Sequence, residues 1–391
     1  MATPPAAVFD ADNHYYEATD AFTRHLDPKM AKRCMQWAEI DGRTRLLVGG
    51  KVNRFIPNPT FDPVSKPGAL IEYFRGKGTI DNLAAAFGEL DPIKPAYRDP
   101  EARVAVMDEQ GVEAAFLFPT LGVGMEQAFE HDPEALLAAF RAFNRWLHDD
   151  WTFDYRDRIF AAPYITLTDV DYAIDELEFA LEHGARLINM RPAPVRSRSG
   201  NRSLGHPDHD PFWARVDEAG ITVAMHAGDN SYGFMLEAWG ASGEFQAFRL
   251  PPLFQLLTMS PISDAVAAFI ADGIFHRFPR IRLATIENGS EWVVPLAGKL
   301  NKIAKMRPDL FAEHPMDTFR RHVWVSPFYE DDLHGLAELI GVDHMLFGSD
   351  WPHAEGLVEP LDYLDDLEGF SQDDVDKIMS ANARGLTTPV T

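Results

Sequence analysis

Short runs of apolar residues that end in polar residues recur along the chain, and a stretch of helical periodicity follows each of them. We count eight such runs, at residues 8–12, 114–118, 159–164, 186–190, 221–225, 281–286, 322–326 and 345–348. Continuous apolar runs of this length are typical of strands that are buried on both faces of a parallel sheet. The pattern therefore predicts an α/β fold in which eight strands alternate with helices.

The segments between these runs carry signals for helix ends. Asp99 and Asp132 each precede a proline, which places a capping carboxylate just before the first helical turn. Gly111 and Gly220 follow helical segments at the position where a left-handed residue ends many helices. Eight strands with such helices between them close most simply into a (β/α)₈ TIM barrel, so we expect one barrel domain over residues 1–391.

The chain is longer than a typical barrel of about 250 residues, and the surplus falls mainly in two insertions. They span residues 13–113, after the first strand, and 228–278, after the fifth. Within the first, Gly49 and Gly50 predict the turn of a β-hairpin, and a proline-rich loop follows at 57–67. Both insertions leave from the carboxyl ends of strands, where barrel enzymes build their sites. We expect them to form a lid over the barrel mouth.

Composition and charge narrow the classes of function. The chain is 46% hydrophobic, enough for a large core, and its 36 basic against 60 acidic residues give a net charge of −24. This charge argues against binding to nucleic acid or to an anionic membrane. The single cysteine, Cys34, excludes an intrachain disulfide and a cysteine-based metal site. With neither a signal-like N-terminus nor a membrane-length apolar run, we expect a cytoplasmic protein that acts on a small molecule.

Side chains with metal-ligand chemistry follow three of the predicted strands. Asp12 and His14 lie two apart at the end of the first strand, so they point to the same side. His226 follows the fifth apolar run, and Asp350 follows the eighth. The carboxyl ends of barrel strands meet at one face, where these side chains would converge. Carboxylate and imidazole ligands suit Zn²⁺, Mn²⁺ or Fe²⁺, and we expect one divalent ion, with zinc favoured.

The segments that carry these residues resemble a known family. Residues 10–17 (DADNHYYE), 225–228 (MHAG) and 348–353 (GSDWPH) are similar to the amidohydrolase superfamily. They are most similar to the branch that includes aminocarboxymuconate-semialdehyde decarboxylase and the resorcylate-type decarboxylases. The resemblance covers nearly the whole chain and implies a (β/α)₈ barrel, a dimer or larger assembly, and a single divalent metal. Its implied ligands are Asp12, His14, His226 and Asp350.

The end of the sixth strand departs from that branch. Many members have a histidine there that acts in proton transfer, whereas this chain has Glu287. A glutamate of ordinary pKa, about 4.3, is anionic at neutral pH, so it can be a further ligand or a base but cannot hold a substrate carboxylate. We predict that Glu287 and Asp350 are the catalytic residues. A purely structural role for Glu287 is the alternative.

Four further residues are candidates for substrate binding. Arg191, at the end of the fourth strand, and Arg54, in the first insertion, can hold a carboxylate because a guanidinium group offers two parallel donors. A structural role for Arg191 agrees equally well with the sequence. Trp351 can line an aromatic pocket, and His353 can fix the loop around Asp350 or contact the substrate.

These roles support three interpretations of function. We expect hydrolysis of a small carboxylated or cyclic compound by metal-activated water, because water activation tolerates Glu287 better than substrate-carboxylate binding does. The alternative is non-oxidative decarboxylation of an aromatic or unsaturated acid, in which Asp350 protonates the carbon that loses CO₂. A barrel that binds a small metabolite without turnover is the third interpretation.

Overall fold

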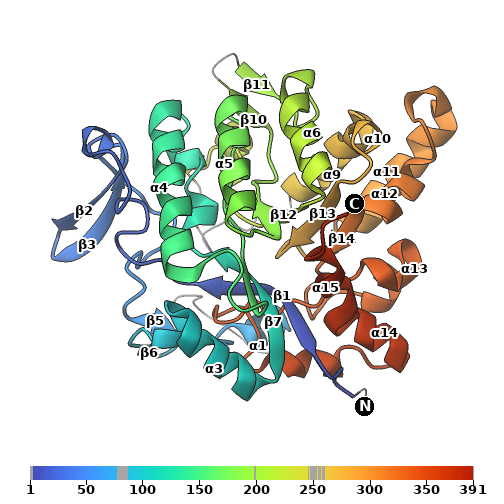
Figure 1. Ribbon diagram of the computed structural model, residues 1–391, viewed down its shortest axis with the longest axis horizontal. Helices are drawn as coiled ribbons and strands as arrows, with labels where there is room; N and C mark the ends of the chain where they lie inside the picture. Colours follow the sequence, from blue (N-terminus) through green and yellow to red (C-terminus); the bar gives the residue numbers. More distant parts are fainter. Residues whose placement is uncertain are drawn as a thin grey trace.

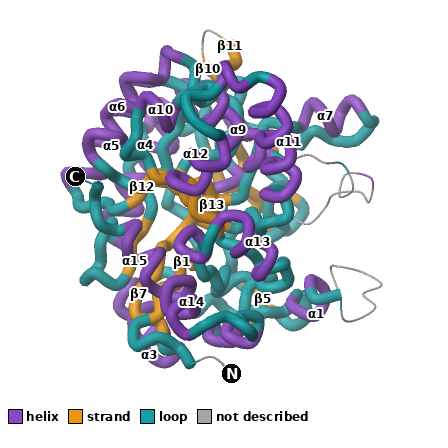
Figure 2. The backbone as a smooth tube through the Cα atoms, turned by 90° about the vertical axis from the view of Figure 1, so that its right-hand side faces the viewer, coloured by secondary structure: helices purple, strands orange, loops and turns teal. Residues whose placement is uncertain are grey.

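Parallel strands form the centre of the protein. The computed structural model describes residues 3–76, 87–197, 200–244, 246, 253, 257 and 260–390. In Figure 2 the strands lie inside a shell of helices and loops. One parallel sheet has the order β1-β7-β8 and the other has the order β14-β13-β12-β9. Their bounds are β1 (Val8–Tyr15), β7 (Val112–Pro119), β8 (Ile159–Ala161), β9 (Leu187–Asn189), β12 (Thr222–His226), β13 (Arg282–Ile286) and β14 (Val323–Val325).

Isolated contacts close these two sheets into one barrel. Tyr164, just beyond β8, bridges to β9, and Met345 bridges to β14. The segment after Met345 then returns to the first strand, where the amide of Ala11 donates to the carbonyl of Phe347 at 2.8 Å. Eight segments therefore form the wall of the barrel, in the order in which the sequence predicts them. The predicted (β/α)₈ fold is confirmed.

The eighth of these segments is irregular. Residues 345–348, predicted as a strand, form one bridge instead of a ladder. Side chains take over its attachment to β1, since the carboxylate of Asp10 accepts hydrogen bonds from the amide and the hydroxyl of Ser349, at 2.9 and 2.5 Å. Gly348 passes so close to β1 that a Cβ there would lie 2.5 Å from the Cβ of Asp12. The segment is thus shaped by its contacts with the site.

Helices cover the outside of the barrel (Figure 1). The carboxylates of Asp99 and Asp132 accept hydrogen bonds from amides in the first turns of α3 and α4, as predicted. Gly111 and Gly220 have φ of 73° and 60°, which confirms the left-handed helix ends. The helices are α3 (Pro100–Gln110), α4 (Pro133–Trp151), α5 (Val170–Glu182), α6 (Asp210–Ala219), α9 (Pro261–Ala271), α10 (Ile274–Arg277), α11 (Val293–Met306), α12 (Pro315–His322), α13 (Leu333–Ile340), α14 (Gln372–Asp376) and α15 (Asn382–Leu386).

The first insertion contains the predicted hairpin. Strands β3 (Arg43–Val48) and β4 (Lys51–Val52) pair around Gly49 and Gly50, whose φ values are 56° and 76°. A further strand that the pattern did not predict, β2 (Met35–Ile40), pairs with β3 and projects with it in Figure 1. Shorter elements of the two insertions and of the loop before α6 are α1 (Ile71–Phe74), β5 (Val64–Ser65), β6 (Leu90–Asp91), β10 (Val195–Ser197), β11 (Gly200–Arg202) and α7 (Gly233–Ala238).

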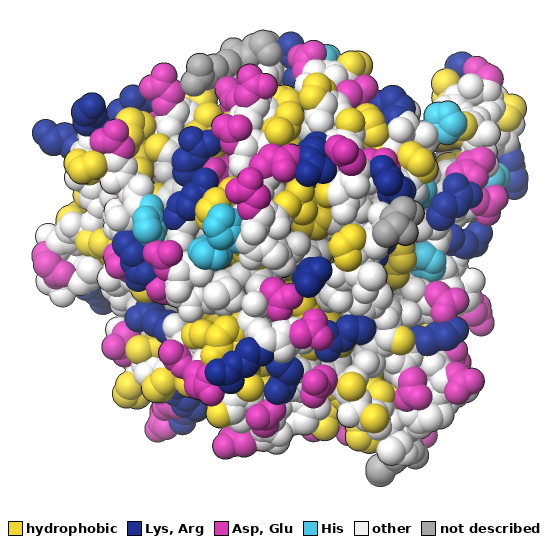
Figure 3. All heavy atoms as spheres, in the orientation of Figure 1, with side chains coloured by type: hydrophobic (Ala, Val, Ile, Leu, Met, Phe, Trp, Pro, Cys, Tyr) yellow, Lys and Arg dark blue, Asp and Glu magenta, His cyan; other side chains and the backbone are white. Residues whose placement is uncertain are grey.

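Parts of both predicted insertions, at 77–86 and 247–252, lie outside the described residues. Acidic and basic side chains are interspersed over the face shown in Figure 3. Among the helices of the described ranges, none combines the length and the apolar character needed to cross a membrane.

Candidate metal centre and cavity

Four side chains from three strands meet at the mouth of the barrel. Asp12 and His14 lie on β1, His226 is the last residue of β12, and Glu287 follows β13. One ligand atom from each lies within 4.8 Å of the others, and the Nε2 atoms of His14 and His226 are 3.1 Å apart. We refer to these four residues as the ligand cluster. Mixed imidazole and carboxylate donors of this kind hold divalent transition metals.

The contacts of the ligand cluster fit such an ion. His226 Nδ1 lies 2.7 Å from the carbonyl oxygen of Ala227, so this nitrogen is a donor and Nε2 faces the cluster, where it can bind an ion once it has lost its proton. Asp12 Oδ1 is buried without a hydrogen-bond partner, 3.3 Å from His14 Nε2 and 3.4 Å from His226 Nε2. A buried unpaired carboxylate oxygen is unfavourable, and a cation within the cluster would compensate it.

Glu287 is placed between the two histidines. Its Oε2 lies 2.9 Å from His226 Nε2 and 3.4 Å from His14 Nε2. Burial opposes ionisation of this carboxyl, but the charges of His226 and His14 outweigh burial and lower its pKa. Burial likewise opposes protonation of His226, yet the carboxylates of Glu287 and Asp12 raise its pKa to about 10. Glu287 is therefore an anion within the cluster, as a ligand or a base would be.

Asp350, predicted as a ligand, lies at the edge of the cluster. Its Oδ1 is 3.4 Å from His14 Nε2 and 2.6 Å from His353 Nδ1, although the angles of the shorter contact do not form a hydrogen bond. With His14, Glu287 and His353 it makes a second group of donor atoms within 4.8 Å. Burial, followed by the charge of Glu287, raises the pKa of Asp350 well above its ordinary value. Burial lowers the pKa of His353, so burial favours the neutral form of both groups.

The two predicted catalytic residues share a strained backbone. Glu287 has a φ of 53° and Asp350 has a φ of 55°, in the left-handed region that residues with a Cβ rarely adopt. Each such residue costs roughly 1–3 kcal/mol and persists where the surrounding structure imposes it, often at functional sites. Six other described non-glycine residues also have a positive φ, so this strain agrees with a functional role for Glu287 and Asp350 but does not by itself identify the site.

Two buried side chains that the sequence did not single out hold the site together. Asp10 bonds to Ser349, as described, and its burial raises its pKa to about 6. Arg103 of α3 donates to the carbonyl of His14 at 2.6 Å, and burial lowers its pKa to about 9. Its guanidinium carbon lies 4.6 Å from the ring centre of Trp351. Trp351 therefore packs against Arg103 and is not among the described residues that line the cavity.

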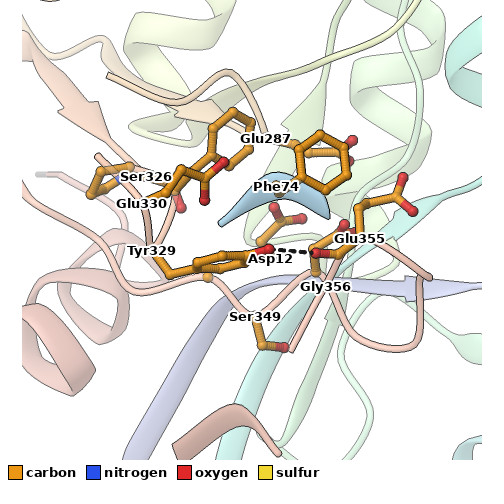
Figure 4. A pocket seen from close by; sticks show the side chains of 13 residues that line it. Asp12, Phe74, Glu287, Ser326, Tyr329, Glu330, Ser349, Glu355 and Gly356 are labelled. Atoms are coloured by element: carbon orange, nitrogen blue, oxygen red, sulfur yellow. Dashed lines mark hydrogen bonds between the residues drawn. The ribbon is translucent and has the colours of Figure 1, made fainter. Parts of the chain in front are cut away.

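A cavity of about 140 Å³ opens beside the ligand cluster (Figure 4). Cavities of about 150 Å³ hold benzene, so this one matches a single ring. Phe74 reaches it from α1 in the first insertion. The other loop residues on its wall were missed because sequence patterns do not give the path of loops. The lining consists of five acidic residues, three aromatic residues and five small ones: Asp12, Glu287, Glu330, Asp350, Glu355, Phe74, Phe328, Tyr329, Ser326, Pro327, Gly348, Ser349 and Gly356.

The residues predicted to bind substrate lie outside this lining. Arg191 is buried, with Nη1 2.8 Å from Asp229 and Nη2 3.3 Å from Glu126. The anion clamp expected at Arg191 is therefore already occupied by two carboxylates of the protein. Arg54 is exposed and pairs with Glu244 at 3.3 Å, away from the cavity wall.

His353 lies behind the cavity wall, beside the ligand cluster. Its ring stacks on His14 with centroids 3.9 Å apart, and its Nε2 lies 2.9 Å from the hydroxyl of Thr120. Together with its 2.6 Å contact to Asp350, this placement agrees with the predicted role of fixing the loop around Asp350.

Comparison with known proteins decides the family. The sequence model described as Amidohydrolase matches residues 40–386. The chain belongs to the amidohydrolase family. The solved structure of an amidohydrolase from Mycobacterium avium subsp. paratuberculosis K-10 is 45% identical over 99% of both chains, with a TM-score of 0.93.

Two solved structures with lower identity and a similar fold are decarboxylases. A 2,6-dihydroxybenzoate decarboxylase from Rhizobium is 19% identical over 83% of this chain and 98% of that one, with a TM-score of 0.57. A 5-carboxyvanillate decarboxylase from Novosphingobium aromaticivorans DSM 12444, complexed with manganese, is 15% identical over 97% and 96%, with a TM-score of 0.60. These two likenesses show the fold.

A curated relative is the 2-amino-3-carboxymuconate-6-semialdehyde decarboxylase of Dictyostelium discoideum, which is 24% identical over 196 residues. The match covers 48% of this chain and 51% of the relative, so it spans about half of the relative's length.

Proposed function

We propose that this amidohydrolase is a metal-dependent decarboxylase of a small ring-shaped carboxylic acid, in place of the hydrolase that the sequence alone favours. The observation that carries the proposal is the position of Asp350, whose carboxyl lies on the wall of a ring-sized cavity beside the ligand cluster. The reaction class of the relatives named above supports it: two fold neighbours and the curated relative are decarboxylases.

The residues divide the work of this reaction. Asp12, His14, His226 and Glu287 would hold a divalent ion, which supplies Lewis-acid polarisation of the substrate oxygens. The carboxyl of Asp350 donates its proton to the ring carbon that bears the carboxylate, and ring electrons form the new C–H bond. The bond to the carboxylate then breaks, its electron pair returns to the ring, and CO₂ leaves. Burial raises the pKa of Asp350 and thus favours the protonated carboxyl that this step needs.

The experiment uses the manganese-loaded protein and single-ring acids labelled with ¹³C in the carboxyl group, in D₂O. We expect release of labelled CO₂ and one deuterium on the carbon that lost it. In Asp350→Asn we expect kcat to fall by about 10²–10⁴-fold with the manganese content retained. Asp362→Asn, at an exposed position, is the matched control and should behave as wild type. Turnover near the wild-type rate in Asp350→Asn would exclude this role.

Hydrolysis is the second candidate because one contact favours it. The anionic carboxylate of Glu287, 2.9 Å from His226, can accept a proton from water. In ¹⁸O-labelled water, hydrolysis would place the label in the product without release of CO₂, which separates the two reactions.

A further inference from the structure

One residue of the cavity wall comes from the first insertion. The other described lining residues belong to β1, to the loops after β13 and β14, or to the eighth segment and the loop that follows it, whereas Phe74 is the last residue of α1. Its side chain is 37% exposed, so one side of the ring faces solvent while another faces the cavity. Figure 4 shows this ring among the side chains that line the cavity. Phe74 therefore lies between the cavity and solvent.

The backbone that leads into α1 is attached to the loop after the eighth segment. The amide of Gly68 donates to the carbonyl of His353 at 3.1 Å, and the amide of Leu70 donates to the carbonyl of Ala354 at 2.7 Å. The side chain of Leu70 is fully buried. The start of α1 is therefore fixed to a loop that itself forms part of the cavity wall.

The residue after Phe74 holds the other end of α1. Nη1 and Nη2 of Arg75 donate to the two carboxylate oxygens of Asp366 at 3.2 and 3.0 Å, a parallel pair of bonds that suits the planar guanidinium group. The guanidinium carbon also lies 4.7 Å from the ring centre of Tyr329, another residue of the wall, whose hydroxyl donates to the carbonyl of Glu355 at 3.3 Å. Because both ends of α1 are attached, the ring of Phe74 cannot leave the wall without breaking these contacts.

We propose that Phe74 limits the substrate to a single ring, and that Arg75 is the positioning residue that keeps Phe74 in place. The cavity of about 140 Å³ accommodates one ring. This inference rests on the proposed function, in which the carboxylate lies at the ligand cluster and the ring points away from it. A second ring fused on the side away from the cluster would meet the side chain of Phe74. The substrate class is then a one-ring acid, and fused two-ring acids are excluded.

Two acids that differ by one ring test this inference. Benzoate and 2-naphthoate are titrated separately into the manganese-loaded full chain by calorimetry. In an unrestricted site 2-naphthoate would bind more tightly, because its second ring buries more apolar surface. We expect the reverse in the wild type, with 2-naphthoate at least about tenfold weaker than benzoate, since a ligand that overfills a packed cavity strains its wall. In Phe74→Ala we expect 2-naphthoate to bind at least as tightly as benzoate.

Arg75→Met tests the positioning role separately. This variant removes the two bonds to Asp366, so the ratio of the two affinities should shift toward the ratio in Phe74→Ala. A role in stability alone would lower both affinities together and leave their ratio unchanged. Phe234→Ala alters an exposed phenylalanine of α7, outside the described lining of the cavity, and is the matched control that should keep the wild-type ratio.

Three results would overturn the size limit: no binding of benzoate to the wild type, binding of 2-naphthoate at least as tight as that of benzoate, or a wild-type ratio in Phe74→Ala. An unchanged ratio in Arg75→Met would exclude its positioning role. The manganese content of each variant shows whether the ligand cluster is intact. Because no turnover is measured, failure of decarboxylation would leave an observed size limit standing, and loss of the size limit would leave CO₂ release standing.

Discussion

Two groups of buried charged residues in this barrel differ in whether their charges have partners within the protein. In the first, the guanidinium group of Arg191 lies between the carboxylates of Asp229 and Glu126, 2.8 and 3.3 Å away. Glu126 also accepts a hydrogen bond from the hydroxyl of Thr166 at 2.8 Å. Each charge of this group has an internal partner.

The ligand cluster lacks such a balance. Its carboxylates and imidazoles face one another at 2.9–3.4 Å, and an oxygen of Asp12 has no hydrogen-bond partner. Buried polar groups in folded proteins are usually satisfied, so an unsatisfied group that is buried calls for a species from outside the chain. The group around Arg191 can therefore stabilise the fold by itself, whereas the ligand cluster needs a cation from outside the chain to compensate its carboxylates.

Removal of Arg191 breaks the balanced group, and we expect the largest effect there. Arg191→Met leaves two buried carboxylates unpaired, which should lower the free energy of unfolding by roughly 3–5 kcal/mol. Urea unfolding measures this change, and elemental analysis should show an unchanged metal content. Arg307→Met removes an exposed pair with Asp309 and serves as the control. If Arg191→Met instead had wild-type stability and a raised KM, Arg191 would be assigned to substrate binding.

Removal of His226 tests the unbalanced group. His226→Ala removes one metal ligand, so the affinity for manganese or zinc should fall by more than about 100-fold. Substitution of a residue that only hydrogen-bonds to a ligand usually lowers metal affinity by about 10–100-fold. Elemental analysis of the purified variant and metal titration measure it, while circular dichroism should show an intact fold. His206→Ala, a histidine outside the cluster, should keep its metal. A full metal complement in His226→Ala would contradict the assignment.

The pH dependence of metal binding sharpens the comparison further. The anions around His226 outweigh burial and raise its pKa to about 10, so the metal-free imidazole is protonated at neutral pH. A metal ion must displace that proton, and its affinity should therefore rise with pH, by up to about tenfold per unit for each proton released, and weaken in acid. Calorimetry in buffers of different ionisation enthalpy counts the protons. An affinity that is flat between about pH 6 and about pH 7 would be inconsistent with this competition.

The smallest effect is expected at Arg54. Its pair with Glu244 is exposed, so Arg54→Ala should change the free energy of unfolding by no more than about 1 kcal/mol. Once a substrate is identified, kcat/KM should also be unchanged, because Arg54 does not line the cavity. A drop in kcat/KM of about tenfold or more would show that the first insertion brings Arg54 to the substrate.

The sequence predicts the parts of the site that depend on strand geometry. Asp12 and His14 alternate along one strand, and parallel strands bring His226 and Glu287 to the same end of the barrel. Asp350, predicted as a ligand, and Glu287, predicted as a further ligand or a base, both lie with His14 in a group of donor atoms within 4.8 Å of one another. The sequence could not predict how the irregular eighth segment is attached to β1 through Asp10.

The hydrophobic pattern could not predict which loop residues contact the site. The sequence could not decide between substrate binding and a structural role for Arg191, because its partner Asp229 lies 38 positions away and only the folded chain brings the two together. Phe74, Glu330 and Glu355 likewise reach the cavity from segments without periodicity. Hydrophobic patterns encode which face of an element is buried, but not which loops meet above it.

The left-handed backbone at Glu287 and Asp350 has a consequence for engineering. Glycine adopts this conformation freely, so a glycine at either position would relieve roughly 1–3 kcal/mol of strain. Selection of variants by heat tolerance alone would therefore favour chains that have lost both carboxylates. At these two positions, substitutions that raise thermal stability are expected to lower activity. A screen for stable variants of this protein must therefore measure both stability and activity.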